Sequence, residues 1–208
     1  NKPGNVYLGV AHRLDRPTTG IVMFAKTSKA LPRLNKLFAE KKAHKTYWAI
    51  VKNAPEKPQG TLINWLKKNP KNNKSTAYPK EITDSKKAIL HYKTLKALDN
   101  YVLLEVALET GRHHQIRVQL STIGSPIKGD LKYGFDRSNK DASISLHARR
   151  LQCIHPVSKD TIEGIKIYNA GKRSKGRILR ILWDVWKVYT IAKKTKSNLY
   201  HFHDPELM

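Results

Sequence analysis

The sequence has little cysteine, few acidic residues and no long apolar run. Cys153 is its only cysteine, which excludes an intrachain disulfide and a zinc site built on several cysteines. No apolar stretch approaches the roughly 20 residues of a helix that crosses a bilayer. Residues 1–9 lack the charged and apolar regions of a signal peptide. From these absences we expect a cytoplasmic protein.

The shortage of acidic residues leaves a large positive charge. The 208 residues include 40 Lys plus Arg against 16 Asp plus Glu, a formal net charge of +24. Such a charge favours a polyanionic partner, and nucleic acid is the first candidate because each neutralised phosphate releases counterions. A merely soluble basic protein is the alternative. Self-repulsion at this charge opposes folding unless a partner offsets it.

The first part of the chain predicts a strand, a helix and a second strand. Residues 20–26 are apolar and β-branched, which is typical of a strand. Residues 28–42 predict a helix with Ser28 as its N-cap and Pro32 near the first turn. One face of that helix carries apolar residues at helical spacing: Ala30, Leu31, Leu34, Leu37 and Phe38. Residues 46–51 predict the next strand.

The middle of the chain predicts more strand than helix. Residues 53–79, rich in Lys, Asn and Pro, predict an irregular excursion with a short strand around Leu62. Residues 87–95 and 101–109 predict paired strands, 114–123 a short helix closed by Gly124, and 144–155 a strand. This order favours an α+β fold with a mixed, largely antiparallel sheet and packed helices.

The composition changes after Asp160, so we expect a domain over 1–160 and a divergent basic tail over 161–208. Residues 169–177 predict a flexible basic stretch, and 178–193 a basic amphipathic helix. Trp183 and Trp186 make binding to an acidic membrane surface conceivable. Packing against the core is the commoner role of such a helix, and it is the one we prefer.

The densest group of chemically active side chains is HRLDRPTTG, residues 12–20. A single carboxylate, Asp15, stands among His12, Arg13 and Arg16 on a loop before a strand. Such cations lower the pKa of a carboxylate and keep it ionised, as a nucleophile requires. The alternative is an ordinary loop aspartate paired with Arg13 or Arg16, and without companion motifs that alternative is the commoner one.

A second group, GRHHQIR at residues 111–117, opens the predicted helix of 114–123. Ile116, Leu120 and Ile123 would face the core, while Arg117 would point off that stripe toward a carboxylate or phosphate. His113 and His114 suggest a metal, but helical neighbours point about 100° apart and chelate poorly together. Since no third ligand follows, we expect no metal there.

A third group, HKTY at residues 44–47, begins a predicted strand. Tyr47 is placed to stack on a base, or is simply a core aromatic, the commoner fate of an isolated strand tyrosine. Gly171 and Gly176 have P-loop spacing, but Arg177 and Ile178 replace the Lys and Ser or Thr of that motif. We therefore reject a nucleotide-binding loop.

Taken together, these segments resemble the RluA-type pseudouridine synthase family. HRLDRPTTG resembles its catalytic motif, HKTYWAIV its Lys-x-Tyr motif, and TGRHHQIRVQLSTIGSPIKGDLKYG its third motif. LHARRLQCIHP resembles the strand that follows. The segments occur in the family's order and cover roughly residues 1–160. The resemblance implies a pseudouridine-synthase-like catalytic domain that isomerises uridine in rRNA or tRNA, with no cofactor.

The resemblance also implies roles at matching positions. Asp15 would be the nucleophile, Tyr47 would stack on the target uracil, and Arg117 would pair with Asp15. Arg13 would help to fill the gap left by the flipped nucleotide. Further RNA contacts are expected from four more residues of the motifs: His12, Arg112, His114 and Gln115. RNA rather than DNA is the expected partner, and the chain is expected to be a monomer.

Phosphate contacts would come from surface cations, each of which is equally explained as a solvated side chain. The candidates are Lys67, Lys68, Lys71, Lys74, Lys128, Lys132 and Arg137. The chain departs from the family at both ends. Only eleven residues precede His12, and no family pattern is found after Asp160, so we expect an N-terminally truncated member with an unmatched tail. A non-catalytic, RNA-binding remnant of a synthase is therefore the alternative function.

Overall fold

A computed structural model describes residues 7–156, 161–164 and 200–201 of the chain. The predicted basic stretch 169–177 and the predicted helix 178–193 lie outside the described residues, as does most of the expected tail. No helix in the described ranges is long and apolar enough to cross a membrane.

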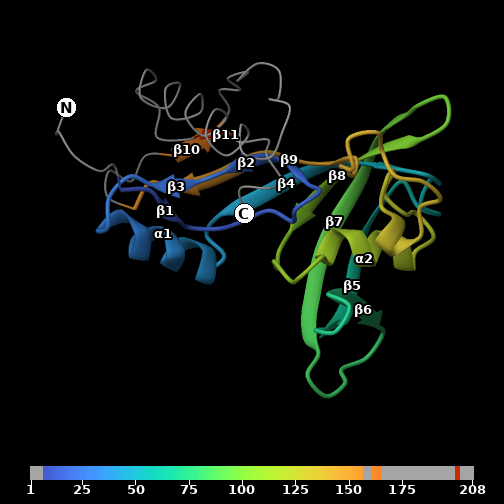
Figure 1. Cartoon of the computed structure of the whole chain (residues 1–208), viewed down its shortest axis with the longest axis horizontal. Coiled ribbons are helices and arrows are strands. Elements are labelled where there is room, and N and C mark those ends of the chain that lie inside the picture. Colours follow the sequence, from blue (N-terminus) through green and yellow to red (C-terminus); the bar gives the residue numbers. More distant parts are fainter. Residues whose placement is uncertain (1–6, 157–160, 165–199, 202–208) are drawn as a thin grey trace.

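The fold is built on a sheet of nine strands in the order β11-β2-β9-β4-β8-β7-β5-β6, with β10 also paired to β9 (Figure 1). These strands are β2 (Thr19–Val22), β4 (His44–Val51), β5 (Gln59–Asn69), β6 (Lys74–Tyr78), β7 (Lys86–Ala97), β8 (Val102–Leu108), β9 (Leu146–Ile154), β10 (Thr161–Gly164) and β11 (Tyr200–His201). A separate antiparallel pair joins β1 (Gly9–Val10) to β3 (Phe24–Ala25). Within the described strands, β2 and β9 form the only parallel pair. The α+β fold and its largely antiparallel sheet are confirmed.

Most predicted strands are present, and one prediction is wrong. The strand predicted over 20–26 is divided at Met23 into β2 and β3. The hairpin of β7 and β8 turns at Asp99 and Asn100, as expected. Residues 53–79 were predicted to be irregular apart from a short strand around Leu62; that strand is present, but it is the long strand β5, and β6 pairs with it antiparallel. Pairing of β5 with β7 along eight registered positions overrides the low strand preference of its Lys and Asn residues.

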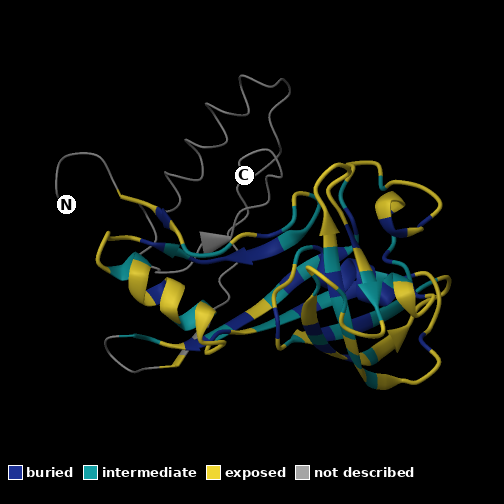
Figure 2. Ribbon diagram, turned by 90° about the horizontal axis from the view of Figure 1, so that it is seen from below, coloured by how far each residue is buried: buried dark blue, intermediate teal, exposed yellow. Residues whose placement is uncertain are grey.

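Helix α1 (Ala30–Ala39) follows the predicted periodicity, but Ser28 is not its N-cap: that position is Lys29, which makes no side-chain cap hydrogen bond. The Ala30 N–H donates to Thr27 Oγ1 at 3.1 Å in the turn before the helix. Leu34 is buried against an apolar cluster of Ile21, Met23, Ala25, Ala43, Leu151 and Cys153. The outer face of α1 is exposed (Figure 2).

Helix α2 (Gln115–Thr122) lies at the other end of the molecule, beside β5 and β6 (Figure 1). Ile116 and Leu120 are buried as predicted, and Gly124 follows the helix at a positive φ of 76°. One prediction for this helix is wrong, because Ile123 is 36% exposed. Arg117 points toward a carboxylate as predicted, and it is 5% exposed. The main apolar cluster joins Ile116 and Leu120 to Leu14, Tyr47 and residues of β4, β7, β8 and β9.

Candidate active site

The loop that carries Asp15 is tied to residues far along the chain. The Thr18 N–H donates to the Asp15 carbonyl at 2.8 Å and closes a turn. Beyond it, the Ile144 N–H donates to the Pro17 carbonyl at 2.9 Å, and Thr19 Oγ1 lies 2.8 Å from His147 Nδ1. These contacts hold the loop above the centre of the sheet.

Gly20 makes this attachment sterically possible. It pairs with Ala148 where β2 runs parallel to β9, and its φ is +130°, a conformation that side chains rarely adopt. A Cβ at this position would collide with the Ala148 backbone. The glycine that ends the HRLDRPTTG motif thus permits the close approach that anchors the loop.

His12 is engaged in holding the same loop. Its Nε2 accepts a hydrogen bond from the Met23 N–H at 2.9 Å, and its ring packs on Phe38 at 4.6 Å between centroids. Burial, and next the charge of Lys45, lower the pKa of His12 to about 4, so the ring is neutral at pH 7. These contacts assign His12 a structural part, and its predicted contact with RNA stays a prediction.

The second motif is held by Gln115, which is 3% exposed. Its Oε1 accepts hydrogen bonds from Thr110 Oγ1 at 2.8 Å and from the Arg112 N–H at 2.9 Å. Its Nε2 donates to the Ile89 carbonyl at 3.0 Å. Gln115 therefore fastens the start of α2 to β7 and offers RNA little surface. Arg112 remains exposed, with its Nε donating to the Lys87 carbonyl at 3.0 Å.

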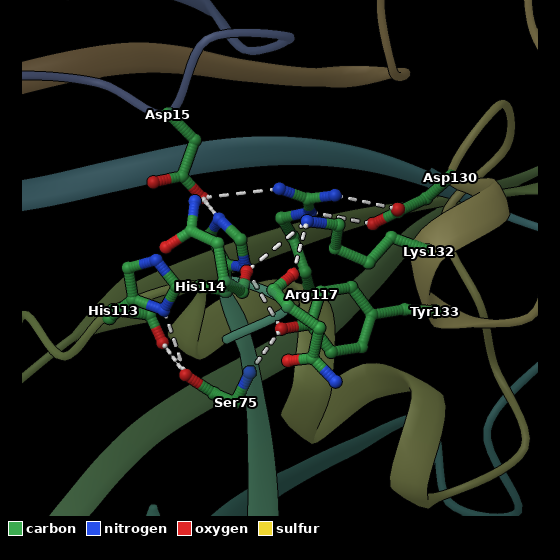
Figure 3. A network of polar contacts seen from close by, with 10 residues as sticks. Asp15, Ser75, His113, His114, Arg117, Asp130, Lys132 and Tyr133 are labelled. Carbon is green, nitrogen blue, oxygen red and sulfur yellow. Dashed lines mark hydrogen bonds and ion pairs between the residues drawn. The ribbon is translucent and has the colours of Figure 1, made fainter. Parts of the chain in front are cut away.

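Arg117 lies between two carboxylates (Figure 3). Its Nε and Nη2 donate to Asp130 at 2.7 and 2.8 Å, and its Nη1 lies 3.7 Å from Asp15 Oδ2. The expected pairing with Asp15 is present, but Asp130 takes the two shorter bonds. Burial disfavours the charge of Arg117, yet the hydrogen bonds to Asp130 and its charge raise the pKa of the guanidinium.

His114 approaches the same oxygen of Asp15 from another side. It sits at a φ of 53°, just before α2, with its Nε2 3.9 Å from Asp15 Oδ2 and its Nδ1 2.9 Å from the Tyr133 hydroxyl. Burial, followed by the charge of Arg117, lowers the pKa of His114 to about 3. The ring is therefore a neutral hydrogen-bonding group at pH 7. His113 stacks on it at 3.7 Å between centroids.

Asp15 itself is only partly desolvated, with a side chain 31% exposed. Burial raises the pKa of this carboxyl, Arg117 and Arg13 oppose the rise, and Asp130 adds to it. The prediction that neighbouring cations lower the pKa of Asp15 is wrong in its net direction. Arg13 and Arg16 are exposed, and among the described residues Asp15 forms an ion pair with Arg117 instead and faces the neutral ring of His114. A raised pKa makes the ionised carboxylate a stronger base and nucleophile.

Tyr47 stands on β4 in the apolar cluster that also contains Leu14, and it is 7% exposed. Burial and the charge of Asp15 raise the pKa of its hydroxyl, so it stays protonated at neutral pH. The structure thus brings together Asp15, Tyr47, His114 and Arg117 from three separate motifs. Stacking of Tyr47 on a base stays a prediction, as does a contact of Arg13 with RNA.

Three polar residues of the site were not predicted as functional: Ser75, Asp130 and Tyr133. Asp130 is 1% exposed and neutralises Arg117, and Tyr133 follows it in the short 3-10 helix η1 (Leu131–Tyr133). Ser75 enters from β6, a strand that the sequence did not predict. The Gly129-Asp130 and Tyr133-Gly134 pairs of the third motif were the available signal for two of them.

The described part of the chain contains no group of three or more His, Cys, Asp and Glu residues that could hold a metal ion. The arrangement is instead a half-buried carboxylate faced by a guanidinium and a neutral imidazole. Such a site can attack an electrophilic carbon and hold the developing charges by fixed donors.

The chain resembles proteins of one family. Residues 1–122 match the family model described as RNA pseudouridylate synthase. An uncharacterized RNA pseudouridine synthase of Synechocystis sp. is 38% identical over 160 residues, which are 76% of this chain and 49% of that protein. The ribosomal large subunit pseudouridine synthase D of Zymomonas mobilis is 34% identical over 165 residues, 74% of this chain and 51% of that one.

Solved structures agree with this likeness. The human RNA pseudouridylate synthase domain containing 4 has a TM-score of 0.62 and 25% identity, over 75% of this chain and 69% of that one. The human RNA pseudouridylate synthase domain containing 1 has a TM-score of 0.65 and 22% identity, over 78% and 69%, and shares the fold. The chain spans about half the length of the curated relatives it matches.

Proposed function

The chain belongs to the RNA pseudouridylate synthase family, and on that premise we propose that it isomerises uridine to pseudouridine in structured rRNA or tRNA, with Asp15 as nucleophile. The observation that carries this proposal is the setting of the Asp15 carboxylate. It is half-buried, its pKa is raised by burial, and one of its oxygens faces both Arg117 and His114.

The proposed reaction rearranges bonds without adding or removing atoms. The carboxylate attacks the target nucleotide, and the bond between N1 of uracil and C1′ of the ribose breaks. The freed base turns within the site, and its C5 forms a new bond to C1′. The bond that the carboxylate formed to the nucleotide breaks, which returns Asp15 to its starting state. The C5 proton leaves and N1 gains a proton, so the product is an isomer of the substrate. Arg117 and His114 hold the carboxylate as its charge changes.

Access to the glycosidic bond requires the nucleotide to leave its stack, at a cost of a few kcal/mol. Phosphate contacts offset this cost, and the net charge of +24 supports them. Several candidate cations stand on the β5–β6 hairpin and beside η1: Lys67, Lys68, Lys71, Lys74 and Lys132. Arg13 would occupy the gap left by the flipped nucleotide, and Tyr47 would stack on the uracil.

The proposal also covers the location, oligomeric state, cofactor requirement and domain bounds of the protein. We infer that the protein acts in the cytoplasm as a monomer, without a cofactor, through a catalytic domain over 1–160. The distinction between rRNA and tRNA as substrate is tested by assaying both.

The test compares Asp15→Asn with Asp99→Asn, which changes a carboxylate in the exposed turn between β7 and β8. Pseudouridine is quantified in unmodified ribosomal and transfer RNA after incubation with the 208-residue chain. Asp15→Asn should lose activity by about 10³-fold or more, since it removes the nucleophile, while Asp99→Asn should keep it. Full activity in Asp15→Asn would refute the assignment. Salt-dependent RNA binding by the folded parent without isomerisation would establish the non-catalytic alternative.

A further inference from the structure

We propose that Tyr133 is a positioning residue: its hydroxyl fixes the tautomer of His114, so that His114 and Arg117 both direct N–H groups at one oxygen of Asp15. The other carboxylate oxygen is then left for the substrate. This inference rests on the proposed role of Asp15 as nucleophile. It adds a residue that touches neither Asp15 nor, in the proposed reaction, the reacting atoms.

One hydrogen bond of Tyr133 has a fixed direction, and the proposal assigns the direction of the other. Its hydroxyl lies 2.8 Å from the Ser75 backbone N and 2.9 Å from His114 Nδ1. The backbone N–H of Ser75 can only donate, so the hydroxyl oxygen accepts that bond. The hydroxyl has one proton to give, and His114 Nδ1 is in place to accept it.

This direction sets the state of the imidazole. A neutral histidine that accepts at Nδ1 carries its proton on Nε2, and Nε2 is the atom that faces Asp15 Oδ2 at 3.9 Å. The opposite tautomer would point a lone pair at the carboxylate and would leave the buried hydroxyl proton without this acceptor. Both consequences are unfavourable because the two side chains are shielded from water: Tyr133 is 4% exposed and His114 is 8% exposed.

Tyr133 also touches the second group that faces Asp15. The Arg117 guanidinium carbon lies 5.0 Å from the centre of the tyrosine ring, and the His114 ring meets it edge-on at 5.6 Å (Figure 3). Arg117 Nη1 and His114 Nε2 both approach Oδ2 of Asp15. Neither of these two contacts involves Oδ1, the other oxygen of the Asp15 carboxylate. One aromatic side chain therefore supports both groups that orient the carboxylate.

Other charged and titratable groups act on these atoms as well. His114 is influenced by Arg117, His113, Lys132 and Lys68, and Asp15 by Arg117, Asp130 and Arg13. Tyr133 does not alter these charges when it becomes phenylalanine. A change in the tautomer or in the pH profile after that substitution is therefore due to the hydroxyl.

The first experiment needs no activity. Two-bond ¹⁵N–¹H spectra of the labelled parent at pH 7 distinguish a protonated from an unprotonated ring nitrogen, and His114→Asn assigns the signal by its disappearance. Asparagine is chosen because it tolerates the left-handed backbone at this position. We expect His114 to be neutral with its proton on Nε2. A proton on Nδ1, or an imidazolium, would overturn the inference regardless of whether the chain is a synthase.

The second experiment uses Tyr133→Phe, which keeps the ring beneath Arg117 and removes the hydroxyl. We expect mixed tautomers at His114 and a kcat about tenfold lower, the equivalent of one hydrogen bond. The KM for RNA should stay within about twofold, and the acid limb of kcat should move to higher pH because Asp15 loses a donor. Tyr92→Phe, at another buried tyrosine in the sheet, is the control. An unchanged His114 tautomer in a folded Tyr133→Phe, or an equal loss in Tyr92→Phe, would contradict the proposal.

Discussion

The two α-helices in the described part of the chain bury different kinds of side chain. Helix α1 has ten residues, of which Leu34 is fully buried, and its contacts are with an apolar cluster. Helix α2 has eight residues and buries six of them, including Gln115, Arg117 and Gln119. Each of these polar residues hydrogen-bonds to a segment that is distant in the sequence from its own turn.

This difference shows what each helix contributes. Apolar contacts on α1 stabilise the fold without fixing the direction of any functional group. Hydrogen bonds from α2 fix the direction of its side chains, because a buried polar group is stable only when it meets its partner with good geometry. The substitutions below separate the two contributions.

The largest effect is expected for Arg117→Met on α2. It leaves Asp130, 1% exposed, as a buried carboxylate without its guanidinium. Loss of one partner from such a buried pair costs about 3–5 kcal/mol of unfolding free energy, measurable by denaturant titration. Activity should also be lost, because Asp15 loses the cation 3.7 Å away.

A second substitution distinguishes stability from chemistry at this pair. Asp130→Asn in the Arg117→Met background removes the orphan charge and should recover more than half of the lost stability without restoring activity. Arg112→Met, which changes an exposed arginine of the same segment, should leave stability within about 0.5 kcal/mol. Recovery of activity in the double variant would show that Arg117 acts only as a structural residue.

A smaller effect on stability, and none on chemistry, is expected for Leu34→Ala on α1. Truncation of a leucine that is 7% exposed leaves a cavity and costs about 2–4 kcal/mol. The folded fraction should isomerise RNA with the kcat of the parent, once enzyme concentration is corrected for unfolding. Lys36→Ala, on the exposed side of the same helix, should change stability by less than about 0.5 kcal/mol. A lower kcat in the folded Leu34→Ala variant would mean that packing of α1 also affects the geometry of the active site.

The smallest effect is expected from acidification. The pKa of His114 is lowered by burial to about 3, below its unfolded value near 6.5, so the unfolded chain takes up the proton first. Its contribution to stability is complete above pH 6.5 and declines as the pH falls toward the folded value. Between pH 7 and pH 5.5 the loss should be about 1 kcal/mol. His114→Asn should flatten this slope, whereas His44→Gln, an exposed histidine of β4, should leave it as it is. An equally steep slope in His114→Asn would contradict the prediction.

The same contrast explains which parts of the structure the sequence could predict. The spacing of Leu31, Leu34 and Leu37 predicted α1 because apolar periodicity is a local property of a helix that packs on one face. For α2 the same reasoning placed Ile123 inside, which is wrong, and although it directed Arg117 at a carboxylate, it did not predict that Arg117 is buried. The partner that brings Arg117 inside is Asp130, thirteen positions later and in no regular relation to the helix.

The sequence predicted which residues form the site, but it did not predict how their surroundings change the pKa of Asp15. Asp15, Tyr47 and Arg117 follow from motifs, but the rise in the pKa of Asp15 depends on burial, which a list of neighbouring charges does not contain. Ser75 was missed because the less exposed positions of β5 and β6 include Gly60, Asn64 and Ser75, so burial alternates along these strands while the apolar pattern of the sequence does not.

The attachment of the Asp15 loop also bears on how the protein folds. The loop is held by Ile144 and by His147, which lies 128 positions beyond its partner Thr19. During synthesis, the HRLDRPTTG motif emerges before β9. The contacts with Ile144 and His147 that hold the Asp15 loop can therefore form only after β9 has been made. Contacts of such high sequence separation form late and slowly. Asp15 is synthesised well before β9, yet it reaches its working position only after β9 is in place.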